Sequence, residues 1–270
     1  MKRRVAAHAL TVFLSQTSLA AWEDAPAATA PFHQAGVTGT FVLHDSAHDT
    51  DRGHAEARAR TRHVPASTFK IANALTGLAT GAVKSVDDPL PYRAKGPACM
   101  PAWERDMGLR ETIRLSNVPI FQELARRIGT ARMREHVARL DYGNGDIGTQ
   151  VDRFRLDGPL AISAIEQTRF LARLARVTLP VPVDAQRAVR DILLVHSGPG
   201  WKLYAKTGWQ HAPGAGVGRL GRAGRRAACL RAQPAHSRSG RRAAPHHAWP
   251  RQPRGAGPAG RFMSAHRRRR

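Results

Sequence analysis

The chain has 270 residues, enough for one medium-sized domain or two small ones. Its formal net charge of +23 is unevenly distributed, because residues 215–270 hold 15 arginines and no lysine, aspartate or glutamate, whereas residues 1–214 carry a net charge of only +8. This distribution argues against a protein that binds nucleic acid along its whole length. After the N-terminal segment no stretch approaches the roughly 18 apolar residues of a membrane span, so none is predicted.

Residues 1–20 are predicted to be a secretory signal peptide. Three basic residues precede a mostly apolar run, and small residues around Ala20 provide a cleavage site. The alternative is a frayed N-terminus without a targeting role. We expect the mature protein to be periplasmic or secreted. Export permits disulfides, but Cys229 lies in the arginine-rich segment, so neither a bond to Cys99 nor a metal site is predicted.

The body of the chain starts with a predicted strand at residues 39–44, followed by a polar, turn-rich run at 45–53. Apolar side chains at Ile71, Leu75 and Leu78 have helical spacing and predict a helix over residues 67–78. Further helices are predicted at residues 109–115, 119–128, 131–140, 164–177 and 184–195. A capping box of Ser163 and Glu166 starts the fourth of these, and Asp184 is the expected cap of the fifth.

A loop at residues 142–148 and a final strand at residues 201–207 complete the predicted elements. A strand, several helices and a second strand indicate an α+β fold, in which a helical subdomain is inserted between parts of an antiparallel sheet.

Four short motifs follow one another along this body: Ser67-Thr68-Phe69-Lys70, Ser116-Asn117-Val118, Tyr142-Gly143-Asn144 and Lys206-Thr207-Gly208. A serine hydroxyl is a weak nucleophile at neutral pH and needs an adjacent base. Lys70 stands one helical turn from Ser67 and can be that base if burial lowers its pKa or its head group is modified. Each motif alone can be a chance match, since a chain of this length contains roughly one S-x-x-K at random. Their conjunction predicts a serine acyl-transfer site.

This conjunction resembles the class D (oxacillinase-type) serine β-lactamases, which are penicillin-recognising serine enzymes. The likeness covers about residues 37–214 and includes the segments 65–71 and 158–163. The Tyr142-Gly143-Asn144 element indicates class D, because class A would have Ser-Asp-Asn and a separate glutamate base. The resemblance implies the penicillin-recognising fold, a β-lactam as small-molecule substrate, no metal, and no nucleic-acid partner.

The resemblance also implies a role for each catalytic residue. Ser67 would attack the lactam carbonyl, and Lys70, carboxylated by carbon dioxide, would be the general base. A dry pocket favours the neutral amine that reacts with carbon dioxide, and Phe69 and Val118 would help to keep it dry. Ser116 would relay a proton toward the leaving nitrogen, although a helix-capping serine is the alternative.

The remaining predicted site residues would bind the substrate or support the reacting groups. Lys206 and Thr207 would hold the substrate carboxylate, and the backbone N–H of Trp209 would complete the oxyanion hole with that of Ser67. The full predicted substrate-binding set is Val118, Tyr142, Asn144, Lys206, Thr207, Gly208 and Trp209. The residues predicted behind them are Phe69, Arg155 and Leu156.

Arg155 departs from the family pattern, which has a tryptophan there that donates an N–H to the lysine carbamate. Arginine could pair with a carbamate, but it equally adds a cation beside Lys70 in a pocket that should be apolar. A buried charge is costly unless it has a well-placed partner. We therefore expect weak carboxylation of Lys70, slow deacylation, and recovery of activity in Arg155→Trp.

Residues 215–270 are the second departure from the family, which continues with central strands and a closing helix. This segment is composed mainly of Arg, Ala, Gly, Pro and His without period-2 runs, so a disordered, basic, low-complexity tail is predicted. The C-terminal strands and helix would then be missing and a sheet edge exposed. A shifted reading frame in a GC-rich gene explains the composition. The rival explanation, an RNA- or membrane-binding arm, has few aromatic residues for base stacking.

Three functions are therefore weighed for the body at residues 21–214. The first is hydrolysis of β-lactams by a class D enzyme. The second is a penicillin-acylated sensor or transpeptidase-like module, and the third is an inactive, frameshifted product. Neither the range of β-lactams nor the oligomeric state follows from the sequence.

Overall fold

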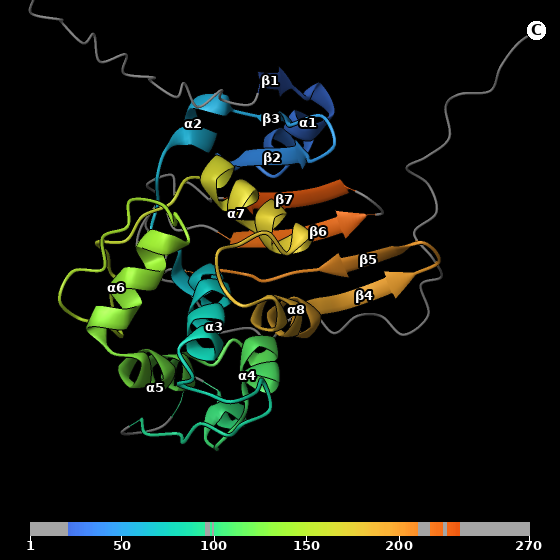
Figure 1. The fold of residues 1–270 in the computed structure, drawn as a ribbon. Helices are drawn as coiled ribbons and strands as arrows, with labels where there is room; N and C mark the ends of the chain where they lie inside the picture. Colours follow the sequence, from blue (N-terminus) through green and yellow to red (C-terminus); the bar gives the residue numbers. More distant parts are fainter. Residues whose placement is uncertain (1–20, 95–97, 99, 210–216, 224–225, 233–270) are drawn as a thin grey trace, which may run out of the picture. The chain divides into compact units, whose positions relative to one another are not determined.

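The computed structural model describes residues 21–94, 98, 100–209, 217–223 and 226–232 (Figure 1). The predicted signal peptide, Cys99 and most of the 215–270 segment lie outside the described residues. Two sheets and a group of helices confirm the predicted α+β class. None of the described helices has the length and hydrophobicity that crossing a bilayer requires.

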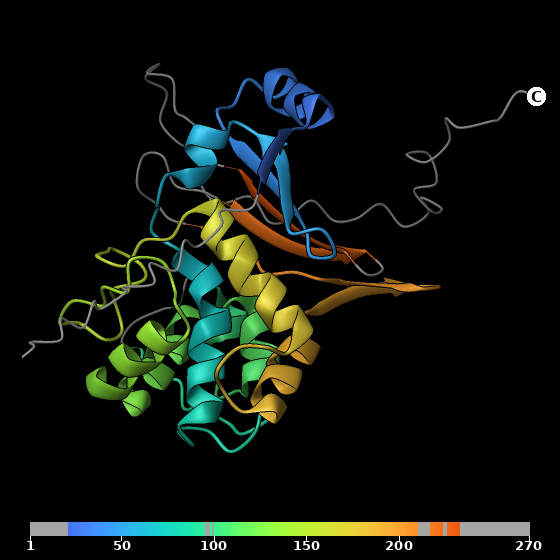
Figure 2. The same cartoon turned by 45° about the horizontal axis from the view of Figure 1, so that its top comes forward.

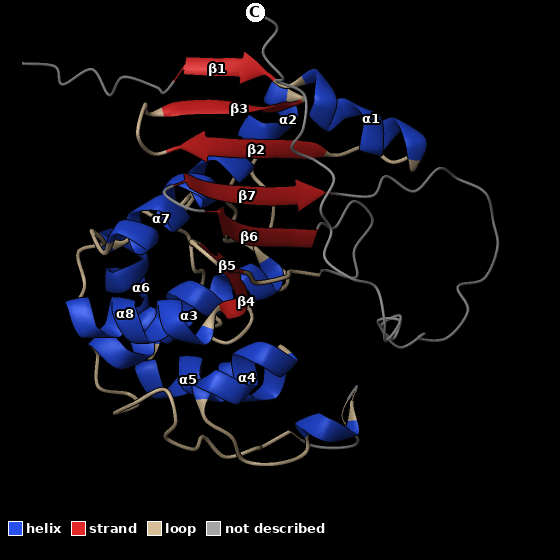
Figure 3. Ribbon diagram, turned by 90° about the vertical axis from the view of Figure 1, so that its right-hand side faces the viewer, coloured by secondary structure: helices blue, strands red, loops and turns tan. Residues whose placement is uncertain are grey.

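The larger sheet has five strands in the order β1-β3-β2-β7-β6 (Figure 3). Their bounds are Ala21–Asp24 (β1), Thr40–Asp45 (β2), Thr50–His54 (β3), Val217–Ala223 (β6) and Arg226–Ala232 (β7). Strand β1 pairs with β3 in parallel, and the other pairings in this sheet are antiparallel. The smaller sheet is an antiparallel hairpin of β4 (Leu194–Gly198) and β5 (Trp201–Tyr204). The predicted strands thus correspond to β2 and β5, although β5 ends three residues earlier than expected.

Strand β3 corrects the second half of the polar turn predicted over residues 45–53, whereas residues 46–49 form the expected turn. It pairs with β2 so closely that a Cβ atom at Gly53 would lie 2.0 Å from the carbonyl oxygen of Phe41, which only glycine avoids. Asp51 is buried in β3, where its Oδ1 lies 2.9 Å from Nδ1 of the buried His44 in β2. A strand that buries a polar pair lacks the alternation of apolar residues by which strands are recognised.

Strands β6 and β7 differ from the predicted absence of strands after residue 214. Strand β7 pairs with β2, and β6 pairs with β7, so the sheet continues past β2 instead of ending there. Strand pairing uses backbone N–H and C=O groups, which every residue except proline provides in full, and neither segment contains proline. The rest of the predicted tail lies outside the described residues.

Helices make up the second part of the fold. Their bounds are Pro26–Gln34 (α1), Glu56–Arg60 (α2), Lys70–Ala79 (α3), Leu109–Leu115 (α4), Val118–Ile128 (α5), Thr130–Arg139 (α6), Ala164–Arg176 (α7) and Val183–Ile192 (α8). The sequence predicts all of these except α1 and α2. Helix α8 follows Pro182 instead of a capping Asp184, and it ends at Ile192 because Leu194 already begins β4.

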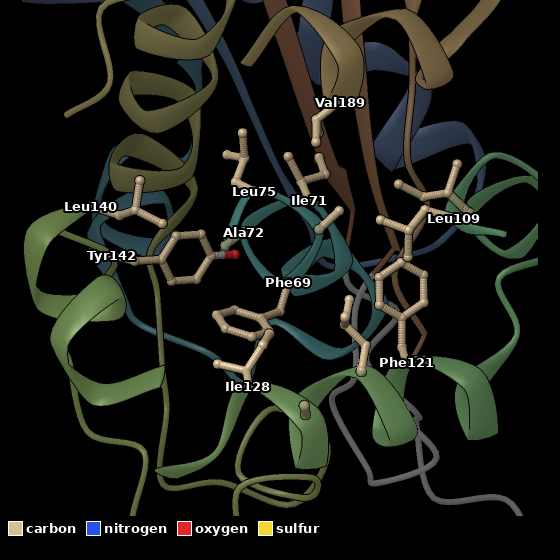
Figure 4. Packing of buried hydrophobic residues seen from close by; sticks show 14 of the residues in the cluster. Phe69, Ile71, Ala72, Leu75, Leu109, Phe121, Ile128, Leu140, Tyr142 and Val189 are labelled. Atoms are coloured by element: carbon tan, nitrogen blue, oxygen red, sulfur yellow. The ribbon is translucent and has the colours of Figure 1, made fainter. Parts of the chain in front are cut away.

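Helix α3 lies at the centre of the main hydrophobic core. Its first eight residues are all buried, and it contacts α5, α6 and α8. Figure 4 shows Ile71 and Leu75 of α3 surrounded by side chains from neighbouring elements, among them Leu109, Phe121 and Val189. The predicted apolar spacing along this helix is therefore the spacing of a core helix, and the packing fixes its first residue, Lys70, inside the protein.

Helix α7 connects the core helices to the larger sheet. The predicted capping box is present, since Ser163 Oγ accepts from the backbone N–H of Glu166 at 3.2 Å and the Glu166 carboxylate accepts from the N–H of Ser163 at 2.8 Å. The helix contacts β2 and β7, and also α8 (Figure 2). This arrangement fixes the segment before α7, which carries Arg155, next to the helical core.

Candidate active site

Ser67 and Lys70 occupy a tight turn that leads into α3. A 3-10 turn, Ala66–Phe69, precedes the helix, and Thr68 Oγ1 donates to the carbonyl oxygen of Pro65 at 2.7 Å. Ala66 has a φ of 49°, a left-handed conformation that is strained for alanine. Ser67 is 9% exposed and Lys70 is fully buried, and Lys70 Nζ donates to Ser67 Oγ at 2.6 Å. The turn therefore places the Lys70 amine within hydrogen-bond distance of the Ser67 hydroxyl, the candidate nucleophile.

Ser116 lies beside the same amine. It follows α4 in a left-handed conformation, with a φ of 53°. Lys70 Nζ donates to the carbonyl oxygen of Ser116 at 3.0 Å and to its Oγ at 3.2 Å. The side chain that caps α5 is that of Asn117, whose Oδ1 accepts from the N–H of Ile120 at 3.1 Å. The hydroxyl of Ser116 is therefore turned to the lysine instead of to a helix end.

Lys206 approaches Ser116 from the other side. It follows β5, is 6% exposed, and donates from Nζ to Ser116 Oγ at 2.8 Å and to the carbonyl oxygen of Thr207 at 2.8 Å. Thr207 is half-buried, and Trp209 is 72% exposed. The first and last of the four motifs, which are 136 positions apart, thus meet through Ser116.

Burial and repulsion by neighbouring cations lower the pKa values of both lysines. The pKa of Lys70 lies well below the ordinary 10.5, chiefly because of burial and then because of the charges of Arg155 and Lys206. Burial, with a further effect of Arg155, lowers the pKa of Lys206 to about 7. Among the residues that the structure describes, no carboxylate forms an ion pair with either lysine. The site can therefore hold a neutral amine, which is a competent base.

Arg155 is the third basic group of this cluster. It is 1% exposed, and its Nε, Nη1 and Nη2 atoms have no hydrogen-bond partner among the described residues. Burial lowers the pKa of Arg155 to about 10. The ring of its neighbour Phe154 lies 5.0 Å from that of Phe69, edge to face, which brings the segment against the turn of Lys70. Leu156 on its other side is half-buried.

Aromatic side chains form the wall behind Lys70. The Phe121 ring centroid lies 5.6 Å from Lys70 Nζ, and the ring of Phe69 contacts that of Tyr142 at 5.3 Å (Figure 4). Tyr142 is buried, and its Oη donates to Gln167 Oε1 at 2.7 Å. Phe121 was not predicted, although its place three residues after Val118, in one helix, is a usable signal. The predicted dry environment of the amine is thus present on this side.

Val118, Asn144 and Gly208 have different places around the site. Val118 is the first residue of α5 and is half-buried. Asn144 is exposed and braces its loop, since Nδ2 donates to the carbonyl oxygen of Pro159 at 3.0 Å and Oδ1 accepts from the N–H of Ala161 at 3.0 Å. A Cβ atom at Gly208 would lie 2.9 Å from Thr68 Cγ2, so this glycine lets the chain after Lys206 approach the Ser67 turn. Asn144 therefore shapes the loop.

Known proteins match both the sequence and the structure. Residues 38–220 match the family of the penicillin-binding protein transpeptidase domain. The β-lactamase OXA-5 of Pseudomonas aeruginosa is 37% identical over 214 residues, which cover 77% of this chain and 78% of that protein. The β-lactamase OXA-2 of Salmonella typhimurium is 37% identical over 191 residues, which cover 69% of this chain and 68% of that protein.

Solved structures lead to the same family. The class D β-lactamase FUS-1 (OXA-85) from Fusobacterium nucleatum subsp. polymorphum matches with a TM-score of 0.75 at 34% identity, covering 80% of this chain and 91% of that one. The class D β-lactamase YbXI from Nostoc matches with a TM-score of 0.72 at 32% identity, covering 76% and 88%. These matches confirm the resemblance inferred from the four motifs, and the chain belongs to the class D β-lactamases.

Proposed function

We propose that this chain hydrolyses β-lactams through an acyl-enzyme on Ser67. The observation that supports this most directly is the 2.6 Å contact between Lys70 Nζ and Ser67 Oγ, in a chain whose relatives are named β-lactamases. The two groups are within hydrogen-bond distance, which a base needs to take the proton of a nucleophile. Ser67 Oγ attacks the lactam carbonyl, the C–N bond breaks, and the ester on Ser67 is then hydrolysed by water.

The other groups around Ser67 have roles in proton transfer, substrate binding and oxyanion stabilisation in this proposal. Ser116 Oγ touches both lysines, so it can pass the proton from Lys70 toward the leaving nitrogen. Protonated Lys206, with Thr207, holds the substrate carboxylate by charge-assisted hydrogen bonds. The backbone N–H groups of Ser67 and Trp209 stabilise the oxyanion.

Lys70 fits the carboxylated form that the family resemblance implies. Carbon dioxide bound to Nζ of Lys70 would supply an anionic general base. Three observations support the fit: the amine is fully buried, its pKa is lowered toward the neutral form, and the nearby Arg155 guanidinium has no hydrogen-bond partner among the described residues. Phe121 and Phe69 keep water from this side of the amine.

We also propose that the protein is exported and that its deacylation is slow. Export rests on residues 1–20, which have the basic start and apolar run of a signal peptide. Slow deacylation rests on Arg155, because a cation beside the base weakens its affinity for a proton. The same observation favours a second candidate, a penicillin-acylated module that does not turn over.

Mass spectrometry and a chromogenic assay separate these functions. The purified chain is incubated with benzylpenicillin and weighed intact, and nitrocefin turnover is followed with added bicarbonate. A hydrolase gives turnover and an adduct on Ser67, whereas a module gives one lasting adduct per chain. Ser67→Ala should abolish the adduct, and the exposed Ser197→Ala should keep it. A folded chain that forms no adduct and turns over no nitrocefin would refute the proposal.

A further inference from the structure

The guanidinium of Arg155 is buried without any hydrogen-bond partner among the described residues. All three of its nitrogens are in this state, and the residue is 1% exposed. Buried polar groups are nearly always hydrogen-bonded, and a buried cation is stable only beside an anion. A charged group in this position therefore indicates a missing anionic partner.

The nearby carboxylates are already engaged by other arginines. Asp152 Oδ2 accepts from Arg126 Nη1 at 2.7 Å, and Asp157 pairs with the exposed Arg153. Asp152 raises the pKa of Arg155 by its charge but does not bond to it. The partner of Arg155 thus has to come from another group of the site.

The segment of Arg155 lies against the turn of Lys70. The rings of Phe154 and Phe69, which directly precede Arg155 and Lys70, pack edge to face with centroids 5.0 Å apart. The charge of Arg155 is close enough to lower the pKa of Lys70, and that of Lys206 adds to the effect. This repulsion disfavours an ammonium on Lys70 and favours any change that makes Lys70 neutral or negative.

We propose that Arg155 is the counter-ion of a carboxylated Lys70, an assignment that rests on the proposed function. In this step the neutral Nζ of Lys70 forms an N–C bond to carbon dioxide. One C=O electron pair moves onto oxygen, and one amine proton leaves to a buffer base. The resulting carbamate would be the anionic partner that the guanidinium lacks among the described residues. Its two oxygens match the planar fork of N–H donors of arginine.

This assignment reverses the sign of one effect expected from the sequence. The folded chain already bears the free-energy cost of burying the Arg155 charge. An anion on Lys70 compensates for that cost, so Lys70 should bind carbon dioxide more tightly. The same pairing makes the carbamate a weaker base, because a bonded cation lowers its affinity for a proton. Arg155 is therefore a positioning residue: it holds the carbamate in place and at the same time makes it a weaker base.

The test is a titration with carbon-13-labelled bicarbonate, followed by the carbamate carbon resonance in NMR. Lys70→Ala should lose the resonance, which assigns it to that side chain. Arg155→Met should raise the half-saturating bicarbonate concentration by about 10- to 100-fold, the loss expected for charge-assisted hydrogen bonds. The half-saturating concentration of Arg155→Lys should lie between those of the unmodified chain and Arg155→Met, because lysine keeps the charge but loses the forked N–H donors. The matched control, Arg153→Met, removes an exposed arginine and should leave the titration unchanged.

Two outcomes would overturn the assignment. One is equal or tighter binding of carbon dioxide by a folded Arg155→Met, with folding checked by circular dichroism. The other is the absence of the resonance from the unmodified chain. Acylation of Ser67 by benzylpenicillin is measured on the same samples: a chain that is acylated without a carbamate keeps the proposed function and loses this assignment. A chain that forms an Arg155-dependent carbamate but is never acylated keeps this assignment and loses the proposed function.

Discussion

Lys206 donates from Nζ to the Oγ of Ser116 at 2.8 Å, although 90 residues separate the two in sequence. Lys70 donates to the same oxygen from the other side, at 3.2 Å. Burial and the charge of Arg155 lower the pKa of Lys70 well below its ordinary value, and repulsion by Lys206 across this hydroxyl adds to the effect. Ser116 Oγ is thus the side-chain atom through which Lys70 and Lys206 are linked.

The first prediction concerns the pH dependence of acylation. Lys206 has a pKa of about 7, so it is charged below that pH and becomes neutral above it. Binding of the substrate carboxylate requires the charge, and the apparent KM for benzylpenicillin should therefore rise as the pH increases through about 7. Lys206→Arg keeps the charge at all these pH values and should remove the rise. Steady-state or adduct-formation kinetics from pH 5.5 to 9 measure it.

Lys202→Arg is the control for this experiment. Lys202 lies on β5 four residues before Lys206, but its side chain is exposed. This variant should reproduce the profile of the unmodified chain. An unmodified chain whose KM stays flat across pH 7 would show that Lys206 does not hold the carboxylate.

The second prediction concerns stability. A lysine with a folded-state pKa of about 7 and an unfolded value of 10.5 binds fewer protons when folded across that interval. Stability rises with pH wherever the unfolded chain binds more protons, so the free energy of unfolding should increase from pH 7 to about 10. The lowered pKa of Lys70 acts in the same direction. Denaturant unfolding at several pH values measures the slope.

The variant Lys206→Met should reduce this slope, because it removes one of the two groups that cause it. Lys202→Met removes an exposed lysine and should leave the slope as it is. A Lys206→Met slope equal to that of the unmodified chain would contradict the assignment of the lowered pKa to Lys206.

The sequence predicts the helical half of the fold well, because its signals there are local. Apolar spacing along α3 and the capping box at Ser163 depend on residues a few positions apart, and both are found. Ser67, Ser116 and Lys206, from three of the four motifs, are also joined by hydrogen bonds around the Lys70 amine, whereas Asn144 of the remaining motif braces its own loop. The contact of Lys206 with Ser116, 90 residues apart, was not predicted from the sequence and is seen only in the structure.

The features that the sequence misses depend on distant partners. Strand β3 buries Asp51 against His44 of the neighbouring strand β2. Arg169, 118 residues later in the sequence, adds a distant contact, with its Nη2 3.4 Å from Asp51 Oδ2. The pairing of β7 with β2 is likewise a backbone property that composition does not reveal. That Arg155 finds no hydrogen-bond partner in the described part of the chain belongs to this class, because it depends on where the nearby carboxylates are bonded.

The third prediction is that Arg155→Met stabilises the chain in buffer freed of carbon dioxide. Replacing an unpaired buried charge by an apolar side chain of similar size is neutral or stabilising by about 1–4 kcal/mol. For a chain of this size each kcal/mol raises Tm by about 2–4 °C. Saturating bicarbonate should reduce the difference, because the unmodified chain then gains its counter-ion. Thermal unfolding with and without bicarbonate measures both effects.

Arg153→Met is the matched control, since it removes an exposed arginine two positions away. Its effect on the free energy of unfolding should stay within about 0.5 kcal/mol in either buffer. A loss of stability of Arg155→Met in the buffer without carbon dioxide would mean that Arg155 is not an unpaired charge in the folded chain.

The fourth prediction is that Gly208→Ala slows acylation of Ser67. A Cβ atom at this position would lie 2.9 Å from Thr68 Cγ2 and 3.1 Å from the carbonyl oxygen of Pro65, and the latter is backbone that cannot rotate away. The segment after Lys206 must therefore move from the Ser67 turn, with an overpacking cost of about 1–3 kcal/mol. Misplacement of positioning groups by about 1 Å can reduce a rate by up to about 100-fold, so a loss of about tenfold or more is expected.

Gly36→Ala separates this effect from a general loss of stability. Gly36 has a φ of 60°, so alanine there is strained, but no atom of the described residues lies within 4 Å of the added Cβ. We expect this variant to lower the free energy of unfolding while the rate of adduct formation with benzylpenicillin stays unchanged. Gly208→Ala should lower both quantities. Equal acylation rates for the two variants would mean that the close approach of residue 208 to the Ser67 turn has no part in placing the substrate.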